Sequence, residues 1–307
     1  MDTFSKRLTD TVKIKKTPVM VGLDPRFSAI PEVFRRGISP EDLPRIARAY
    51  HRFSFAILDI VAPLVACVKP QIAFFEELGP WGMVVLSDII RYAHELGLIV
   101  ILDGKRNDIG STAAGYAAAY LGKGSAWEAD SLTVSPYLGE DSLIPFINVA
   151  EKRGSGIFVL VKTSNPGGGM LQDMKEGEVS VYQKTADLVE QKSAEFALSR
   201  GEKYGAVGAV VGATYPQQLE ELRQRMPHAW LLVPGFGAQG GTAKDISAAF
   251  DDDGLGAVIN SSRAIIFAYD RKDYAGRFAA DKWELAVETA TREMIAQLQA
   301  ETKAGRL

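Results

Sequence analysis

A short stretch after an apolar run carries acids and a base at spacings that suit catalysis. Residues 99–102 are apolar, Asp103 and Lys105 follow two residues apart, and Asp108 comes three residues later. Side chains two apart on an extended chain point the same way, so Asp103 and Lys105 can present neighbouring head groups. Asp108 can return toward Lys105 from the loop. Such a group could stabilise developing negative charge and donate a proton.

A second lysine, Lys69, ends the preceding apolar run. A lysine is costly to bury unless it is paired, and Asp103 lies within reach of Lys69 if the two runs are neighbouring strands. The four residues would then form an alternating array of positive and negative charge. A structural salt-bridge network is the alternative for any one of them, but four at adjacent strand ends favour a functional site.

The stretch from Asp103 to Ile109, with Thr112 three residues on and Lys69 on the strand before, resembles the signature of orotidine 5'-phosphate decarboxylases. The likeness runs from Asp24 to Arg263, and the length is similar to the longer bacterial form of the family. The resemblance implies decarboxylation of a pyrimidine nucleotide without metal or cofactor. The implied catalytic residues are Lys69, Asp103, Lys105 and Asp108. It also implies a homodimer in which Asp108 reaches the partner subunit's site.

Two segments near the C-terminus suit a phosphate group. Residues 234–241 are glycine-rich and follow the seventh apolar run, and Arg263 follows the eighth. Glycine lets backbone N–H groups approach an anion, and arginine supplies charged donors. The resemblance assigns the nucleotide phosphate to Gln239 and Arg263, with Gly237 and Asn260 beside them.

The resemblance also assigns three residues to the rest of the substrate. Asp24, after the first run, would hydrogen-bond the ribose hydroxyls with help from Thr112, and Ser164, after the fifth run, would recognise the pyrimidine edge. Each has a plain alternative, because an aspartate before proline and a serine before a turn are common turn residues.

Three other functions remain as alternatives. A phosphosugar aldolase or epimerase would use Lys105 or Lys162 as a Schiff-base lysine, and a non-catalytic barrel would only bind a phosphate ligand. The glycines at 235, 237 and 240 also match a dinucleotide-binding pattern, but that pattern belongs in a first βαβ unit and not near the seventh of eight strands. The three histidines lack metal-ligand spacing, so no metal is expected.

Short apolar, β-branched runs recur eight times with helical segments between them. They read as continuous hydrophobic runs, which is typical of parallel strands buried on both faces. We therefore expect an α/β fold, a single (β/α)8 TIM barrel over residues 1–307. The runs are 18–23, 64–68, 98–102, 131–134, 157–161, 206–211, 230–233 and 257–259.

Two connections, 26–37 and 165–181, are longer than usual, and both follow strands. They are expected as extended rim loops, candidates for a lid or binding loop. Between 39 and 42, Ser39 offers a helix N-cap and Pro40 a first helical residue.

The composition limits the partners. The chain has 307 residues, 47% of them hydrophobic, and a net charge of −3 with both signs interspersed, so a nucleic-acid partner is not expected. The single cysteine, Cys67, excludes an internal disulfide and suits a reducing cytoplasm. The N-terminus lacks the apolar core of a signal peptide, and no run is long enough to span a membrane.

Overall fold

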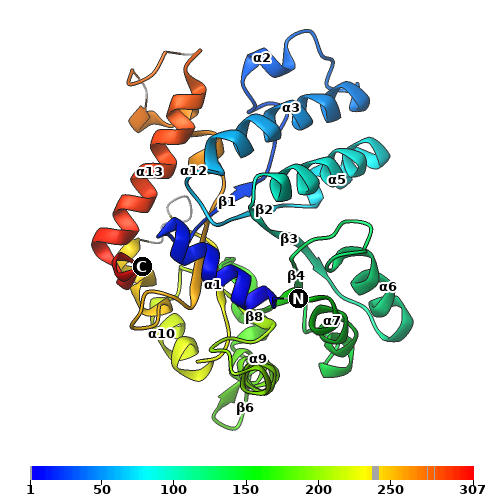
Figure 1. Cartoon of the computed structure of the whole chain (residues 1–307), viewed down its shortest axis with the longest axis vertical. Helices are drawn as coiled ribbons and strands as arrows, with labels where there is room; N and C mark the ends of the chain where they lie inside the picture. Colours follow the sequence, from blue (N-terminus) through cyan, green and yellow to red (C-terminus); the bar gives the residue numbers. More distant parts are fainter. Residues whose placement is uncertain (1, 237–241, 275, 280) are drawn as a thin grey trace.

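Eight parallel strands form a closed barrel that is ringed by helices (Figure 1). The computed structural model describes residues 2–236, 242–274, 276–279 and 281–307. Around the barrel the order is β1, β10, β9, β8, β5, β4, β3 and β2. The bounds are β1 Val19–Leu23, β2 Cys67–Pro70, β3 Ile99–Arg106, β4 Ser131–Val134, β5 Gly156–Lys162, β8 Val207–Val211, β9 Leu231–Val233 and β10 Ala257–Ser261. The predicted (β/α)8 barrel is confirmed.

The strand side chains alternate between two buried layers. On β3, Val100 and Leu102 pack outward in the layer beneath the helices, whereas Ile99 and Ile101 belong to the interior of the barrel. Because the period of a strand is two, Asp103 and Lys105 continue the inward row at the end of β3. Burial of both layers explains why the runs look continuously apolar in the sequence.

The helices surround the barrel and connect its strands. The longer ones are α1 Phe4–Lys15, α3 Leu43–Val61, α5 Gly79–Glu95, α6 Gly110–Tyr120, α7 Glu140–Arg153, α9 Val181–Arg200, α10 Pro216–Arg225 and α13 Trp283–Glu301. Short α-helical turns are α2 Glu32–Arg35, α4 Ala73–Glu76, α8 Gly169–Gln172, α11 Ala243–Ile246 and α12 Arg263–Ile266. The 3-10 turns are η1 Pro166–Gly168, η2 Ser247–Ala249, η3 Ala268–Asp270, η4 Lys272–Tyr274 and η5 Lys303–Arg306. No described helix is both long and apolar enough to cross a membrane.

Helix α3 begins later than the sequence predicts. Its N-cap is Asp42, whose carboxylate accepts a hydrogen bond from the backbone N–H of Arg45 at 3.2 Å, and the expected cap at Ser39 is wrong. Asp42 is as good a cap as serine, and Pro44 then occupies the first turn, where its missing N–H costs nothing.

Helix α1 closes the amino-terminal end of the barrel and was not expected from the sequence. Phe4, Leu8 and Val12 lie on one face and pack into the interior cluster of the barrel. The ring of Phe4 meets that of Phe158 edge-on, with centroids 5.9 Å apart, and Gly156 leaves room for it because a Cβ there would overlap the Phe4 ring. This helix therefore forms a floor beneath the barrel (Figure 1).

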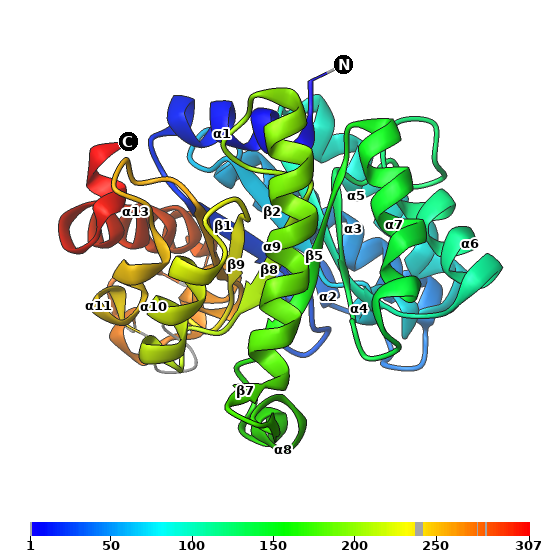
Figure 2. The same cartoon turned by 90° about the horizontal axis from the view of Figure 1, so that it is seen from below.

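The two long connections contain short regular elements. Residues 26–37 form turns and α2, and residues 165–181 form η1, α8 and a hairpin of β6 Lys175–Glu176 and β7 Val179–Ser180 that leads into α9. We call residues 165–180 the insertion. Figure 2 shows it projecting from the end of the molecule opposite α1, which is the carboxyl end of the strands.

Candidate active site

A cavity of about 530 Å³ opens at the carboxyl ends of the barrel strands. All eight barrel strands, or the segments that directly follow them, contribute to its lining. Cavities of this volume and position hold small ligands in barrel enzymes. The lining includes seven predicted site residues, which are Asp24, Lys69, Asp103, Lys105, Ser164, Asn260 and Arg263.

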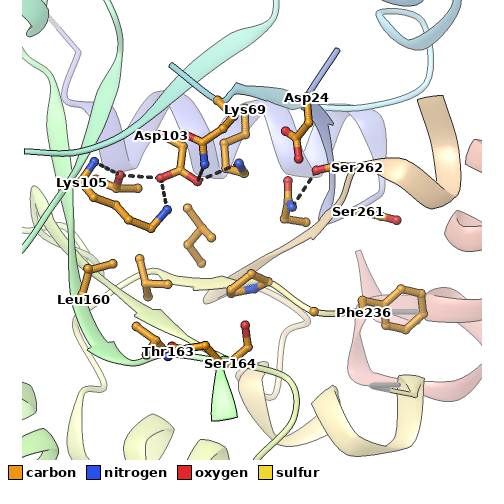
Figure 3. A pocket seen from close by; sticks show the side chains of 18 of the residues that line it. Asp24, Lys69, Asp103, Lys105, Leu160, Thr163, Ser164, Phe236, Ser261 and Ser262 are labelled. Carbon is orange, nitrogen blue, oxygen red and sulfur yellow. Dashed lines mark hydrogen bonds and ion pairs between the residues drawn. The ribbon is translucent and has the colours of Figure 1, made fainter. Parts of the chain in front are cut away.

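The carboxylate of Asp103 is the centre of the charged end of this cavity (Figure 3). It accepts hydrogen bonds from Lys69 Nζ at 2.9 Å and Gln71 Nε2 at 3.1 Å on one oxygen. The other oxygen accepts from Lys105 Nζ at 2.7 Å and Thr133 Oγ1 at 2.8 Å. Four donors fill the acceptor positions of a carboxylate, so Asp103 is held ionised and in one orientation.

Burial and nearby charge have opposite effects on the pKa of Asp103 and on the pKa of Lys69. Desolvation of Asp103, which is 7% exposed, favours the neutral acid, but attraction to Lys69 and Lys105 outweighs it and holds the pKa of Asp103 far below its usual range. Desolvation likewise disfavours the Lys69 ammonium, but the charges of Asp103 and Asp24 outweigh it and raise the pKa of Lys69. Both groups are therefore charged at neutral pH.

The backbone of β3 is distorted where Lys105 enters the cavity. The pairing of β3 with β4 shifts register between Leu102 and Arg106, and Lys105 has a φ of 45° in the left-handed region. That conformation costs a non-glycine residue about 1–2 kcal/mol. The distorted backbone is held by a hydrogen bond from Lys105 N–H to Thr133 Oγ1 at 2.9 Å. Local strain of this kind occurs at functional sites when surrounding contacts enforce it.

The structure does not bring Asp108 and Thr112 into this cavity. Asp108 accepts a hydrogen bond from the N–H of Ile109 at 2.8 Å, and among the described residues it forms no ion pair with Lys105. Thr112 is exposed on the first turn of α6 and does not line the described part of the cavity. The expected contact of Asp108 with Lys105 is therefore absent within the described part of one chain.

Arg263 and Asn260, two of the residues predicted to lie at the phosphate, also line the cavity. Arg263 begins α12 and is exposed, and Gly235 and Phe236 line the wall after β9. Gln239 and Gly237, the other predicted phosphate residues, lie outside the described residues. The Arg263 guanidinium can supply charged donors to an anion bound beside it.

Two buried oxygens in the cavity have no hydrogen-bond donor among the described residues. They are Oδ1 of Asp24 and Oδ1 of Asn260, and Figure 3 shows Asp24 beside Ser262 at this part of the cavity. A buried acceptor without a partner is unfavourable, so both are suited to a ligand that carries hydroxyl or amide donors. This supports the ribose role predicted for Asp24.

The wall after β5 is joined to the insertion. Gln172 of α8 lines the cavity, accepts a hydrogen bond from the N–H of Thr163 at 3.1 Å and donates to its hydroxyl at 2.8 Å. Ser164 lies beside this contact in the lining (Figure 3). Lys162 is fully buried, pairs with Asp173 of the insertion and does not line the described cavity.

Comparison with known proteins agrees with this geometry. The sequence matches the model of the Orotidine 5'-phosphate decarboxylase / HUMPS family over residues 17–278. The chain belongs to this family. An orotidine 5'-phosphate decarboxylase of Rhodopirellula baltica is 53% identical over 303 residues, which cover 97% of this chain and 100% of the relative.

Two solved structures from Leishmania donovani have the same fold. The OMP decarboxylase has a TM-score of 0.74 at 32% identity, with 97% of this chain and 98% of that chain covered. The UMP synthase has a TM-score of 0.76 at 33% identity, but this chain, 98% covered, spans only 57% of the length of that protein.

Sequence reasoning missed several cavity residues of this decarboxylase-family chain. Gln71 lies two residues after Lys69, and Thr133 is the last residue but one of β4, next to β3, so the strand period places both in the inward row. That signal was available in the sequence. Gln172 had no such signal, because the fold of the insertion brings it back to the cavity. Among the described residues no cluster of three or more metal-ligating side chains occurs.

Proposed function

We propose that this chain converts orotidine 5'-phosphate to uridine 5'-phosphate and carbon dioxide, using its own side chains and no metal or cofactor. Family membership makes it a carboxy-lyase of pyrimidine biosynthesis. The observation that carries the proposed mechanism is the Asp103 carboxylate held between the ammonium groups of Lys69 and Lys105.

Loss of carbon dioxide leaves a carbanion in the plane of the pyrimidine ring, where no carbonyl delocalises it. The enzyme must therefore stabilise it electrostatically. We assign Asp103 a place beside the substrate carboxylate, which it repels, and Lys105 a place beside the reacting carbon. Repulsion falls as carbon dioxide leaves, attraction to the Lys105 ammonium grows, and Lys105 then donates the proton that replaces the carboxylate. Lys69 keeps Asp103 charged and oriented.

The substrate's phosphate belongs at the other end of the cavity, near Arg263, with Gln239, Gly237 and Asn260. Asp24 would bind the ribose, and Ser164 would bind the pyrimidine edge. Thr112 was expected to help bind the ribose, but it does not line the described cavity of its own chain. Binding energy from a remote dianion can close loops and press the base against the charged array. The insertion is a candidate for that closure because Gln172 already contacts the cavity wall.

Three variants test the catalytic roles. An ultraviolet assay should show Lys105→Ala and Asp103→Asn lowering kcat by at least about a hundredfold, the scale of a lost general acid or charge-stabilising group. Lys123→Ala, an exposed lysine outside the cavity, is the control and should retain activity. Decarboxylation by Lys105→Ala or Asp103→Asn within about tenfold of the unmodified enzyme would refute the roles. Activity should also survive a chelator.

The rival aldolase function predicts a different result. A Schiff-base lysine would be trapped by borohydride together with a carbonyl substrate, whereas the decarboxylase forms no imine. Lys162 is engaged by Asp173 and by the rings of Tyr182 and Tyr215, so the rival function depends on Lys105 alone. Release of carbon dioxide likewise excludes a barrel that only binds its ligand.

We also propose that the chain is a homodimer in which Asp108 completes the array of the partner subunit. In support, the rim beside Asp108 exposes the apolar side chains of Ile109, Tyr137 and Leu138 after the neighbouring strands β3 and β4. A twofold interface places the same patch of both subunits face to face.

The buried Cys67 thiol suits the reducing cytoplasm as the location.

Mixing two inactive variants tests the shared site. Lys105→Ala and Asp108→Asn should each be nearly inactive alone. After they are unfolded and refolded together, about a quarter of the sites should contain both natural residues, because half of the dimers are mixed and each mixed dimer has one such site. No recovery, with mixed dimers shown by mass spectrometry, would contradict a shared site.

A further inference from the structure

Thr133 occupies the one place in the described site where the backbone of Lys105 and the carboxylate of Asp103 are held by the same atom. Its Oγ1 accepts from Lys105 N–H at 2.9 Å and donates to Asp103 Oδ1 at 2.8 Å. We propose that the Thr133 hydroxyl is a positioning group, which fixes the Lys105 ammonium against Asp103 for proton transfer. This inference rests on the roles proposed above for Asp103 and Lys105.

The direction of both hydrogen bonds is fixed by chemistry. A backbone N–H can only donate, so it uses an acceptor position of the hydroxyl, and an ionised carboxylate can only accept, so it takes the hydroxyl proton. Thr133 is 1% exposed, so water competes little for its hydroxyl. A hydroxyl can meet both demands at once, whereas a methyl group can meet neither.

The distortion of β3 explains why such a group is needed. The left-handed φ of Lys105 is unfavourable for a lysine and persists only where its surroundings enforce it. The shifted pairing with β4 leaves Lys105 N–H bonded to a side chain at that point. Without the hydroxyl, the backbone can relax and the ammonium moves relative to Asp103, and small displacements of a reacting group cost much rate.

Valine replaces threonine with almost no change of shape, so Thr133→Val removes the hydroxyl and little else. We expect kcat to fall between about tenfold and about a hundredfold, the range for losing a hydrogen bond to a charged group. KM and the affinity for uridine 5'-phosphate should stay near their original values, because the phosphate and ribose contacts are elsewhere. Thr133→Ser keeps the hydroxyl and should recover most of the lost kcat.

Ser131 provides the matched control. It lies two residues earlier on the same inward row of β4, is fully buried, and its hydroxyl has no partner among the described residues. Ser131→Ala should therefore leave kcat unchanged. An equal loss in Ser131→Ala would overturn the proposal, because any missing hydroxyl on β4 would then have the same effect.

Rates should be expressed per site that binds uridine 5'-phosphate in a titration, which removes the contribution of unfolded protein. If too little Thr133→Val protein binds uridine 5'-phosphate to be measured, Thr133→Ala is tested instead, and the same changes in kcat and KM are expected. Unchanged kcat in either variant, or a rise in KM alone, would overturn the positioning role. If Lys105→Ala loses activity while Thr133→Val does not, only this inference fails. If Lys105→Ala stays active, the proposed mechanism itself is wrong.

Discussion

The ion pair between Asp103 and Lys69 in the site also contributes to the stability of the protein. Asp103 and Lys69 form a buried ion pair, so removing Asp103 leaves the Lys69 ammonium without its hydrogen-bonded carboxylate. We expect Asp103→Asn to lower the free energy of unfolding at pH 7 by about 3–5 kcal/mol, the cost of breaking a buried ion pair. Denaturant unfolding monitored by circular dichroism would measure it.

The pH dependence of that difference follows from the lowered pKa of Asp103. The stabilisation from a carboxylate with a lowered folded-state pKa is fully present above its unfolded pKa, about 4, and declines as the pH falls toward the folded-state value. The difference in unfolding free energy between the natural protein and Asp103→Asn should be about 1 kcal/mol smaller at pH 3 than at pH 6. A gap that widens at pH 3 would contradict the assignment.

The sequence is informative about these residues only where the strand period applies. Lys69, Asp103 and Lys105 were predicted to converge, and the structure brings them together, since an inward row on one strand meets that on the next. The bond from Thr133 to Lys105 depends on a register shift that no residue pattern announces. Asp108 could not be paired within one chain, and its predicted contact remains a proposal about two chains.

At the scale of elements, the ion pair of Lys162 with Asp173 fastens the insertion to the barrel. Asp173→Asn leaves the fully buried Lys162 ammonium without its carboxylate, so we expect the insertion to loosen. Gln172 would then be less often in the cavity, and KM should rise about tenfold, equivalent to 1.4 kcal/mol. Faster amide exchange in the insertion, measured by mass spectrometry, should accompany the kinetic change.

A second ion pair, which joins the insertion to α9, gives the control for this prediction. Glu176 pairs with Lys184, but both side chains are largely exposed, and such a pair contributes at most about 1 kcal/mol. Glu176→Gln should leave KM and amide exchange nearly unchanged. A similar rise in KM in both variants would show that the insertion does not depend on the buried pair.

Element boundaries were harder to predict than the elements themselves. All eight strands were expected, because a doubly buried strand has a strong apolar signal. Helix α1 was missed although Phe4, Leu8 and Val12 are spaced four apart, since charged residues surround them. The α3 cap moved from Ser39 to Asp42, because both residue types can cap a helix and the packing decides between them.

For the whole molecule, the barrel separates the site at one end from the floor at the other. Phe4→Ala removes a buried ring from the floor and should lower the free energy of unfolding by about 3–5 kcal/mol. The kcat of the folded enzyme at 25 °C should be unchanged, because the cavity lies at the opposite rim. Ile14→Ala, on the exposed face of the same helix, should change neither quantity. A lower kcat in Phe4→Ala would show that the two ends are coupled.

Cys67 lies fully buried among the interior residues of β2, and burial raises the pKa of its thiol. As the sole cysteine, it gives the protein a built-in reporter. Only molecules whose strands have parted can expose this sulfur to a labelling reagent, so the rate of modification measures how often the barrel opens. That rate should rise in Phe4→Ala and fall when uridine 5'-phosphate is bound.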